Sequence, residues 1–330
     1  MSSAYRIAVI PGDGIGPEVI EAELLVLEAT SLPFEFTTYR AGDGCEDETS
    51  AALPRETLEG ALAAQAVIFG AVGRTAAKVI LRLRAELGSF VNLRPIQAIQ
   101  GVKCIHPQTD LIIVRENSEG MYAGIENTIV PGVITATRVI TEKASLRIAR
   151  YAFEYARDNG RSKVTAVHKN NVLRKSDGLF LECCRTVAAE FPEIAFDEGL
   201  VDSVAMRIVL RPEDFDVMVT TNLFGDILSD LAAGVIGGLG TCASANLGHE
   251  HALFEPVHGT APDIAGKGLA NPAAAIQCGA LLLRYLGERA AAENIEKALE
   301  QSLREGLTTP DLGGKLTTME MAGEIARLMK

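Results

Sequence analysis

The sequence has no excess of positive charge. Its 330 residues contain 31 lysines and arginines against 43 aspartates and glutamates, which gives a net charge of −12 at pH 7. Proteins that bind nucleic acid usually present a basic surface, so this balance argues against DNA or RNA as a partner. It does not exclude a small anionic substrate, because a few local arginines are enough to bind one.

Paired cysteine motifs and long apolar runs are also missing. The six cysteines are scattered without CxxC spacing, which is typical of reduced thiols in a cytoplasmic protein. The longest uncharged run, residues 231–248, contains five glycines and several polar residues, so it is a poor candidate for a membrane span. The first strand-like segment begins with no secretory signal before it. We therefore expect a cytoplasmic protein with no membrane partner.

The chain instead shows short β-branched runs that alternate with longer helical patterns. Such alternation predicts an α/β fold with helices on the faces of buried strands, and the length suits two domains. The expected strands are 6–10, 66–70, 111–114, 164–167 and 216–220. The expected helices are 17–29, 55–64, 75–87, 142–158, 176–190, 272–286, 290–303 and 319–330.

Residues 127–141 break this alternation. They are rich in β-branched residues on both sides of Pro131-Gly132, a dipeptide that favours a turn. The segment is expected to form a hairpin. From the residues alone, it could equally be a clasp between subunits or lie on its own domain.

Asp226 and Asp230 are four residues apart in a segment rich in apolar side chains. If the segment is helical, both carboxylates leave the same face one turn apart and repel each other. A hard divalent cation such as Mg²⁺ or Mn²⁺ would remove that repulsion, so the pair is a candidate metal site. The alternative is an exposed acidic helix end stabilised by the helix dipole.

Three arginines stand in contexts that favour an anionic ligand. Arg84 lies in a helical pattern, Arg94 precedes a proline, and Arg115 ends an apolar strand. Guanidinium groups bind carboxylates through paired hydrogen bonds, so the three together could hold a di- or tricarboxylic acid. Each arginine alone could instead form an internal salt bridge, for which the available acids are Glu86, Glu116 and Glu119.

Two further charged residues, Lys169 and Asp202, each follow a short apolar segment. Lys169 follows the expected strand 164–167 after one intervening residue, His168, at the end where α/β proteins commonly bind ligands, and is a candidate proton acceptor. The alternative is a surface lysine. Asp202 is a candidate third metal ligand.

Two loops punctuated by glycine and proline could hold a nucleotide. Residues 255–267 and 11–18 both offer backbone N–H groups that can bind phosphates. The second loop is not the Rossmann fingerprint, because Pro17 occupies the position of the third glycine.

Together these motifs resemble the β-decarboxylating dehydrogenases, the family of isocitrate, isopropylmalate and homoisocitrate dehydrogenases. The matching segments are PGDGIGPE at 11–18, NLRP at 92–95, VREN at 114–117, HKNN at 168–171, NLFGDILSD at 222–230 and HGTAPDIAGKG at 258–268. They occur in family order and span most of the chain.

The resemblance implies an isopropylmalate dehydrogenase-like two-domain α/β fold that is not a Rossmann fold. The first domain would be discontinuous, from 1–98 and 252–330, and the second would comprise 99–251 with the hairpin of about 127–141 as a β-rich dimer clasp. A homodimer or a dimer of dimers is implied, with each active site in a cleft and completed by the neighbouring subunit.

The resemblance also implies roles for site residues. Arg84, Arg94 and Arg115 would bind the carboxylates of a hydroxy-di- or tricarboxylate substrate, and Asn171 would contact the substrate or nicotinamide. Lys169 would accept the hydroxyl proton, and Tyr122 would protonate the product carbon. Mg²⁺ or Mn²⁺ would be bound by Asp226 and Asp230 with Asp202 of the partner subunit, which would also contribute Lys169.

The nucleotide would contact His258, Gly259, Thr260, Ala261, Asp263, Ile264 and Asn271. Asp263 and Ile264 stand where NADP-dependent relatives have a lysine and a tyrosine. A carboxylate at this position can accept hydrogen bonds from the ribose hydroxyls and would repel a 2′-phosphate, so NAD is the expected cofactor.

The sequence leaves two interpretations of the substrate's side group. Ile80 and Leu81 lie one turn before Arg84 and would offer an apolar surface, worth about 2–3 kcal/mol for a buried alkyl group. This favours 3-isopropylmalate or 3-methylmalate. Arg74 and Lys78 stand where that subgroup is expected to have acids, so an anionic side group, as in isocitrate or homoisocitrate, stays open unless both cations face solvent.

A non-catalytic regulatory subunit is the remaining alternative. Regulatory relatives usually lack one of the catalytic side chains. All of those implied here are present in this sequence, which favours an active enzyme: Tyr122, Lys169, Asp202, Asp226 and Asp230. The resemblance to this family implies a role in amino-acid biosynthesis.

Overall fold

The computed structural model describes residues 4–330, so the expectation about the N-terminal sequence partly concerns residues 1–3, which lie outside it. The chain forms two compact units. The first contains the residues up to Ser89 together with Ala98–Pro107 and Ile236–Lys330, and the second contains Phe90–Gln97 and Gln108–Val235. These limits differ from the proposed domain boundaries. Residues 90–97 group with the second unit, and residues 99–107 and 236–251 group with the first.

The first unit is built on five strands in the order β2-β1-β3-β12-β11. All neighbours are parallel except β11 and β12, and the register between β1 and β3 pairs Ile7 with Ala66 and Ile10 with Phe69. The strands are β1 (Tyr5–Ile10), β2 (Phe34–Thr38), β3 (Ala66–Phe69), β11 (Ala243–Leu247) and β12 (Ala252–Pro256).

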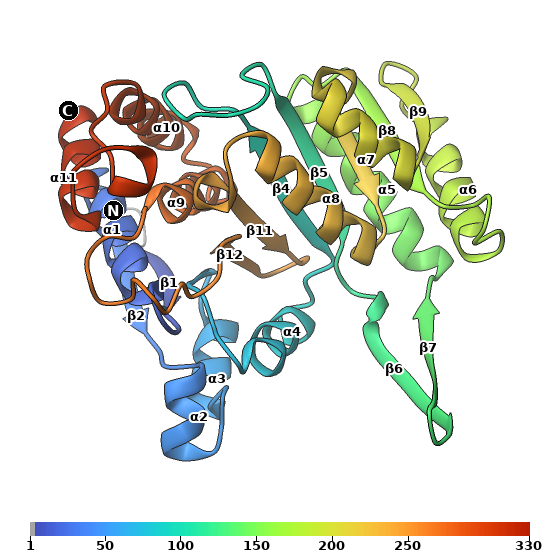
Figure 1. The fold of residues 1–330 in the computed structure, drawn as a ribbon, viewed down its shortest axis with the longest axis horizontal. Helices are drawn as coiled ribbons and strands as arrows, with labels where there is room; N and C mark the ends of the chain where they lie inside the picture. The colour runs from blue at the N-terminus through green and yellow to red at the C-terminus, as the bar shows by residue number, and fades with distance from the viewer. Residues whose placement is uncertain (1–3) are drawn as a thin grey trace. The chain divides into compact units, whose positions relative to one another are not determined.

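Seven α-helices belong to this unit within the part of the chain that the structure describes. Six match helices expected from the periodicity, and α2 was not predicted. They are α1 (Gly16–Ala29), α2 (Asp43–Thr49), α3 (Arg55–Ala63), α4 (Ala76–Glu86), α9 (Ala273–Tyr285), α10 (Arg289–Arg304) and α11 (Thr318–Leu328). Helices α1, α9, α10 and α11 pack on one another as one group (Figure 1), and short 3₁₀ turns lie at Leu239–Thr241 and Pro310–Leu312.

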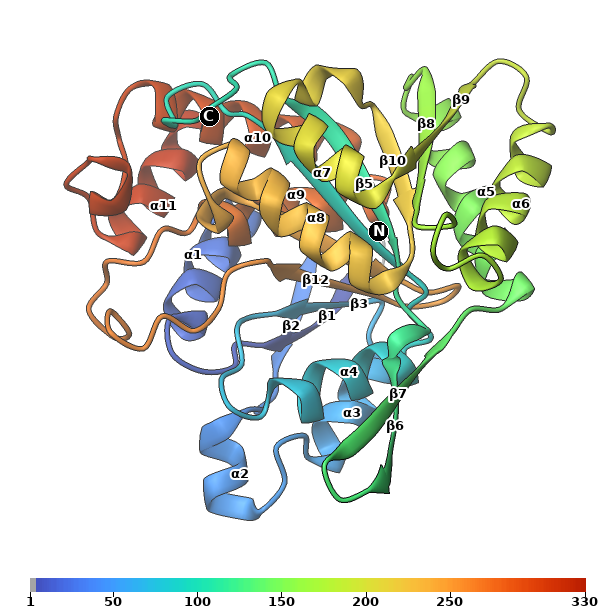
Figure 2. The same cartoon turned by 45° about the vertical axis from the view of Figure 1, so that its right-hand side comes forward.

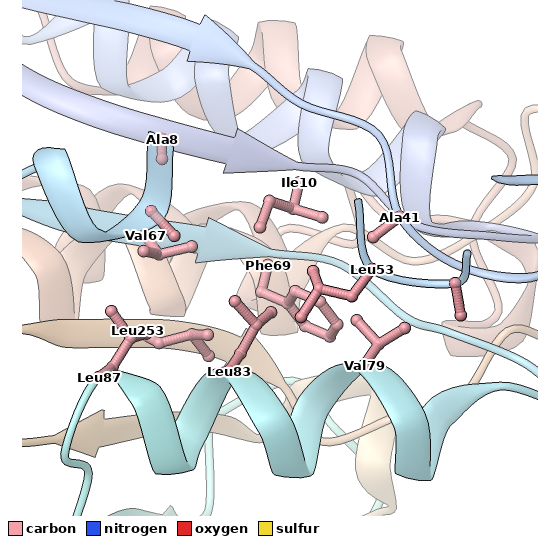
Figure 3. Close-up of a cluster of buried hydrophobic side chains, with 12 residues drawn as sticks. Ala8, Ile10, Ala41, Leu53, Val67, Phe69, Val79, Leu83, Leu87 and Leu253 are labelled. Atoms are coloured by element: carbon pink, nitrogen blue, oxygen red, sulfur yellow. The ribbon is translucent and has the colours of Figure 1, made fainter. Parts of the chain in front are cut away.

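Helix α4 is fixed to the first unit by an apolar stripe. Val79, Leu83 and Leu87 are four residues apart, so they lie on one face, and all three are fully buried. Figure 3 shows this stripe directed at strand side chains such as Val67 and Phe69. The opposite face of α4 is exposed and polar, with Lys78 and Arg82 on it. Ile80 and Leu81 lie between the two faces and are partly buried, so the packing of the stripe fixes their position.

The second unit has five strands in the order β4-β5-β10-β8-β9, parallel except between β4 and β5. They are β4 (Val91–Gln97), β5 (Asp110–Glu116), β8 (Lys163–His168), β9 (Ala195–Leu200) and β10 (Val217–Thr220). The helices of this unit are α5 (Glu142–Asp158), α6 (Ser176–Ala188), α7 (Val201–Leu210), α8 (Asn222–Val235) and a 3₁₀ turn at Pro212–Asp214. Helices α5 and α6 pack together, and α7 and α8 lie side by side with α8 against β4 and β5 (Figure 2).

The predicted hairpin is present. Strands β6 (Gly120–Val130) and β7 (Val133–Val139) pair antiparallel across the Pro131-Gly132 turn and form a separate two-stranded sheet. The ribbon extends away from the rest of the second unit (Figure 1), and Ile129 and Ile134 are more than half exposed. An exposed apolar ribbon is typical of a surface that another chain covers.

These elements confirm the predicted α/β class. All five expected strands form, and they are buried on both faces, which explains why they read as continuous apolar runs. The six cysteines are free thiols, as expected from their spacing. Among residues 4–330, every helix is either too short or too polar to cross a bilayer.

One buried acid is unexplained by this architecture and gives a testable prediction. Glu23 on α1 is 1% exposed, both carboxylate oxygens are buried without a hydrogen-bond partner, and burial raises its pKa well above the ordinary value. A group with a raised folded pKa lowers stability progressively as the pH climbs above its unfolded pKa. We expect Glu23→Met to raise the thermal midpoint, with a gain that grows between pH 5 and pH 8 and reaches about 1–3 kcal/mol.

The matched control is Glu28→Met on the exposed side of the same helix, which should show no such pH-dependent gain. Thermal melts of the three proteins across this pH range measure the difference. A Glu23→Met protein that is less stable than the wild type at every pH would contradict the interpretation.

Candidate active site

Helix α8 presents the paired aspartates. Asp226 and Asp230 are both in its central part and four residues apart, so their carboxylates lie on one side, while Leu228 and Ala232 are buried. The helix that the sequence argument required is therefore formed. The Asp226 side chain is 32% exposed, so it is not a fully solvated helix end.

Two buried arginines from neighbouring strands meet these aspartates. Arg94 on β4 and Arg115 on β5 have side chains that are 7% and 1% exposed. Arg115 Nη1 donates to Asp226 Oδ1, and Arg94 reaches Asp226 Oδ1 at 3.3 Å and Asp230 Oδ1 at 3.2 Å. We call these four residues the Arg–Asp cluster.

The salt-bridge partners proposed from the sequence alone were wrong. Glu116 accepts hydrogen bonds from Ser118 and from the backbone of Glu119 rather than from an arginine. Glu86 Oε1 lies 3.9 Å from Arg82 Nε, and Arg84 pairs with Glu255 instead. The true partners are distant in the sequence, and only the folded sheet brings them to the arginines.

Three polar residues that the sequence argument did not single out orient the guanidinium groups. Asn92 Oδ1 accepts from Arg94 Nε at 2.7 Å, and Ser229 Oγ accepts from Arg94 Nη1. Asn222 Oδ1 accepts from Arg115 at 3.0 Å and 2.7 Å, and its amide nitrogen donates to the Glu119 carbonyl. Asn92 is the first residue of the NLRP motif and Asn222 the first of NLFGDILSD. Their place in these motifs is the sequence feature that could have identified them as site residues.

Tyr122 joins the Arg–Asp cluster from the base of the hairpin. Its hydroxyl donates to Asp226 Oδ2, and the Arg115 guanidinium lies 5.0 Å from the ring centroid. Burial, and next the hydrogen bond to Asp226, raise the pKa of Tyr122 above its ordinary value. The hydroxyl is therefore protonated at neutral pH and can act as a proton donor.

The donor chemistry of the aspartates suits a hard cation. Burial raises the pKa of Asp230, Arg94 opposes this, and the charge of Asp226 raises it further. Oxygen ligands from two neighbouring carboxylates are what Mg²⁺ and Mn²⁺ prefer. Across residues 4–330, however, no three histidines, cysteines or acids are placed so that together they could hold a metal ion, so a single chain provides two of the three predicted acids here.

The third predicted acid lies with the predicted proton acceptor. Lys169 follows β8 and its Nζ is 2.5 Å from Asp202 Oδ1, at the start of α7, which lowers the pKa of Asp202. Asp177, a fully buried residue that the sequence argument missed, accepts the Lys169 backbone N–H at 2.5 Å and a hydrogen bond from Arg138. Asn171 follows on the exposed side of the same loop.

The remaining substrate residues are on α4, in the first unit. Ile80 and Leu81 are partly buried beside the apolar stripe, and Arg84 Nη2 donates to Glu255 Oε1 at 2.6 Å. Glu255 also accepts from Asn246 at 2.7 Å, and Arg84 Nε is buried without a hydrogen-bond partner. Lys78 and Arg74 are exposed but paired, with Glu46 and Asp47 on α2.

The predicted nucleotide loop follows β12 in the same unit. Thr260 O accepts the backbone N–H of Ile15 at 2.9 Å, so the loop is bound to the PGDG turn that follows β1. Ala261 adopts a φ of +36°, a left-handed conformation that costs a non-glycine residue about 1 kcal/mol or more.

His258 fits a nucleotide at this loop. The Nε2 atom of His258 is buried without a hydrogen-bond partner. Burial lowers the pKa of His258, so the ring is neutral and Nε2 can form a hydrogen bond with a ligand. Asp263 is exposed and Ile264 is partly buried. The Asn271 amide is engaged within the protein, since it donates to Asp311 and accepts the N–H of Ala273 at the start of α9.

Comparison with known proteins agrees with this geometry. The family model described as isocitrate/isopropylmalate dehydrogenase matches residues 6–325. The chain belongs to this family. It is 56% identical over 330 residues to the 3-isopropylmalate/3-methylmalate dehydrogenase of Methanocaldococcus jannaschii, covering 99% of both chains. It is 54% identical to the 3-isopropylmalate dehydrogenase of Archaeoglobus fulgidus, covering 98% of this chain and 99% of that one.

A solved structure supports the same fold. The crystal structure of isocitrate dehydrogenase from Methylococcus capsulatus has a TM-score of 0.94 and 44% sequence identity, and the match covers 98% of this chain and 99% of that one. The predicted family, fold and oxidoreductase class are therefore confirmed. The individual roles of the site residues stay predictions.

The packing of Arg115 on α8 gives a test of the Arg–Asp cluster. A Cβ at Gly225 would lie 2.6 Å from Arg115 Cγ and 2.8 Å from its Cβ, near the backbone where the arginine cannot move aside. We expect Gly225→Ala to lower the free energy of unfolding by about 1–2 kcal/mol, because overpacking outweighs the gain in helix propensity.

Gly234 is the matched control, since it is on the same helix and a Cβ there meets nothing within 4 Å. Gly234→Ala should raise the stability by about 0.5–1 kcal/mol. Denaturant unfolding of both variants measures the difference, and an equal gain in stability for both would mean that Arg115 does not pack on Gly225.

Proposed function

We propose that the protein catalyses the NAD⁺- and Mg²⁺- or Mn²⁺-dependent oxidative decarboxylation of 3-isopropylmalate or 3-methylmalate. The observation that favours this substrate class is the partly buried apolar pair Ile80 and Leu81 beside Arg84 on α4. The names of the two archaeal relatives support the same substrates.

Arg84, Arg94 and Arg115 would bind the two carboxylates common to all 3-substituted malates. Charge balance supports this assignment. The Arg–Asp cluster has two positive and two negative side chains, so it is neutral by itself. A divalent cation together with a dicarboxylate is also neutral, so the two can enter together without leaving a net buried charge. Metal and substrate should therefore bind cooperatively.

Asp226 and Asp230, with Asp202 of the partner subunit, would hold the metal. When bound, the metal would draw electron density from the substrate's hydroxyl and keto oxygens, and NAD⁺ would take the hydride. His258, Gly259, Thr260 and Ala261 would line the nucleotide, with Ile264 and Asn271 beyond them. Asp263 is exposed and can accept hydrogen bonds from the ribose hydroxyls while repelling a 2′-phosphate.

Two side chains would move the protons. Lys169, as the neutral amine released from its ion pair with Asp202, would accept the proton of the substrate hydroxyl as the hydride leaves the same carbon, which gives a β-keto acid. After CO₂ departs with cleavage of the C–C bond, Tyr122 would give its hydroxyl proton to the carbon that lost the carboxylate. Asn171 would contact the substrate or the nicotinamide.

A homodimer, or a dimer of dimers, would complete each site. Only two of the three metal acids are gathered within the described part of one chain, which supports donation of Asp202 and Lys169 by a partner. Helices α7 and α8 leave Met206, Leu210 and Ile227 more than half exposed next to these residues, and the β6–β7 ribbon adds a second apolar surface. Surfaces of this kind are usually covered in an assembly.

A substrate panel tests the proposal. With NAD⁺ and Mn²⁺, we expect NADH formation from 3-isopropylmalate or 3-methylmalate with a higher kcat/KM than from isocitrate, homoisocitrate or D-malate. Chelation with EDTA should abolish turnover, and added Mn²⁺ should restore it. Activity with none of the five acids, full turnover after chelation, or an equal kcat/KM with NADP⁺ would each refute the corresponding part of the proposal.

The role of Tyr122 has its own test. Tyr122→Phe keeps the ring over Arg115 but removes the hydroxyl, so kcat should fall about 100-fold or more with a small change in KM. Tyr285→Phe on α9 is the control and should leave kcat unchanged. A Tyr122→Phe enzyme with wild-type kcat would exclude the hydroxyl as the proton donor.

A further inference from the structure

Helix α2 is a short acidic element to which neither the sequence argument nor the proposed chemistry gives a role. Its seven residues, Asp43–Thr49, include four acids and a single buried side chain, Cys45. Such a helix has little apolar surface to hold it in place, and an isolated helix of this length is not stable in water. Specific polar contacts must therefore fix its position.

Two aspartates link α2 to the segment that precedes α4. The Asp13 carboxylate, in the loop after β1, accepts backbone N–H groups of Asp43 at 2.9 Å and of Gly73 at 3.1 Å. The Asp43 carboxylate in turn accepts hydrogen bonds from the Thr75 hydroxyl at 2.8 Å and from the backbone N–H groups of Arg74 at 2.9 Å and Thr75 at 2.8 Å. Burial acts to raise the pKa of Asp43, but these bonds, the one from the hydroxyl first, lower it overall.

Gly73 is required for this approach. A Cβ at that position would lie 2.6 Å from Asp43 Oδ2, so only glycine lets the carboxylate reach the following N–H groups. Helix α2 is therefore joined to the entry of α4 through charge-assisted hydrogen bonds to the backbone. These bonds depend on glycine at position 73, and the Thr75 hydroxyl adds a side-chain hydrogen bond to Asp43 Oδ1 at 2.8 Å.

The next turn of α2 neutralises the two cations of this segment. Glu46 Oε1 is 2.5 Å from Lys78 Nζ, and Asp47 Oδ1 is 2.7 Å from Arg74 Nη2. Glu46 is the more enclosed acid: its side chain is 21% exposed, and its second oxygen is buried without a hydrogen-bond partner. Lys78 is thus the countercharge that this carboxylate needs.

The geometry points to α2 as a specificity-determining element, and this inference rests on the proposed function. Lys78 and Leu81 are three residues apart on α4, so the lysine lies next to the surface proposed to meet the substrate's alkyl group. We infer that Glu46 and Asp47 cancel the charges of Lys78 and Arg74, so that this surface does not attract a substrate with an anionic side group. Preference for an alkyl malate then depends on acids that do not touch the substrate.

Removal of the acids should shift the preference. In Glu46→Gln, the ratio of kcat/KM for isocitrate to that for 3-isopropylmalate should rise about 2- to 5-fold, the range expected for a largely exposed charge pair. The change should occur in KM for isocitrate and leave kcat for 3-isopropylmalate within a factor of about two. Adding Asp47→Asn should increase the shift, and about 0.5 M KCl should reduce it by screening.

Glu48→Gln is the matched control, because Glu48 is on the same helix, loses the same charge, and pairs with Arg40 instead of α4. It should leave the ratio unchanged. Replacing Lys78 by Gln in the Glu46→Gln protein should cancel the shift, which a general loosening of α2 would not do. An unchanged ratio in Glu46→Gln, or an equal shift in Glu48→Gln, would overturn the inference.

The outcomes separate this inference from the proposed function. A wild-type enzyme that turns over none of the malates, or that already prefers isocitrate, would refute the proposed substrate and with it the basis of the inference. A wild-type enzyme that prefers 3-isopropylmalate while Glu46→Gln and Glu48→Gln behave alike would refute the role of α2 only.

Discussion

The contact of two buried arginines with two aspartates of α8 is the interaction on which the second unit depends. A guanidinium group cannot lose its charge at any ordinary pH, so Arg94 and Arg115 need acids or carbonyl groups around them once they are buried. The same pairs fix α8 against β4 and β5 and place Tyr122 against Asp226, so the packing of this unit and the organisation of its polar site have one cause.

The other cations proposed to act on substrate are paired in the same way. Arg84 is bound to Glu255, and Lys169 to Asp202. In an acidic chain, each of these positive groups is held in a defined position by an acid before any ligand arrives, which reduces the ordering that binding would require. For Arg94 and Arg115, the acids are those proposed to take the metal, so metal binding would release the guanidinium groups toward the substrate's carboxylates.

Helix α2 applies the same principle to the first unit. Its acids are used in two ways: Asp43 binds backbone N–H groups, while Glu46 and Asp47 bind side-chain cations. The first use is structural and requires glycine at position 73 of the following segment. The second sets the local charge next to Ile80 and Leu81 and so bears on which side group the surface tolerates.

The sequence by itself determined the α/β class, the five expected strands, the turn at Pro131-Gly132, the placement of Asp226 and Asp230 on one helix face, and the family. These follow from local periodicity, from turn chemistry and from motifs whose residues are close in the chain. Only the tertiary structure decided which acids pair with which arginines, since Asp226 is 111 residues from Arg115, and that Arg74 and Lys78 are neutralised. Helix α2 is also visible only in the tertiary structure. Its seven residues, four of them acidic, show no apolar periodicity, and the carboxylate that holds the helix, Asp13, is 30 residues away in the sequence. Charge pairing acts through space, and a linear pattern shows which charges are present but not which ones the fold brings together.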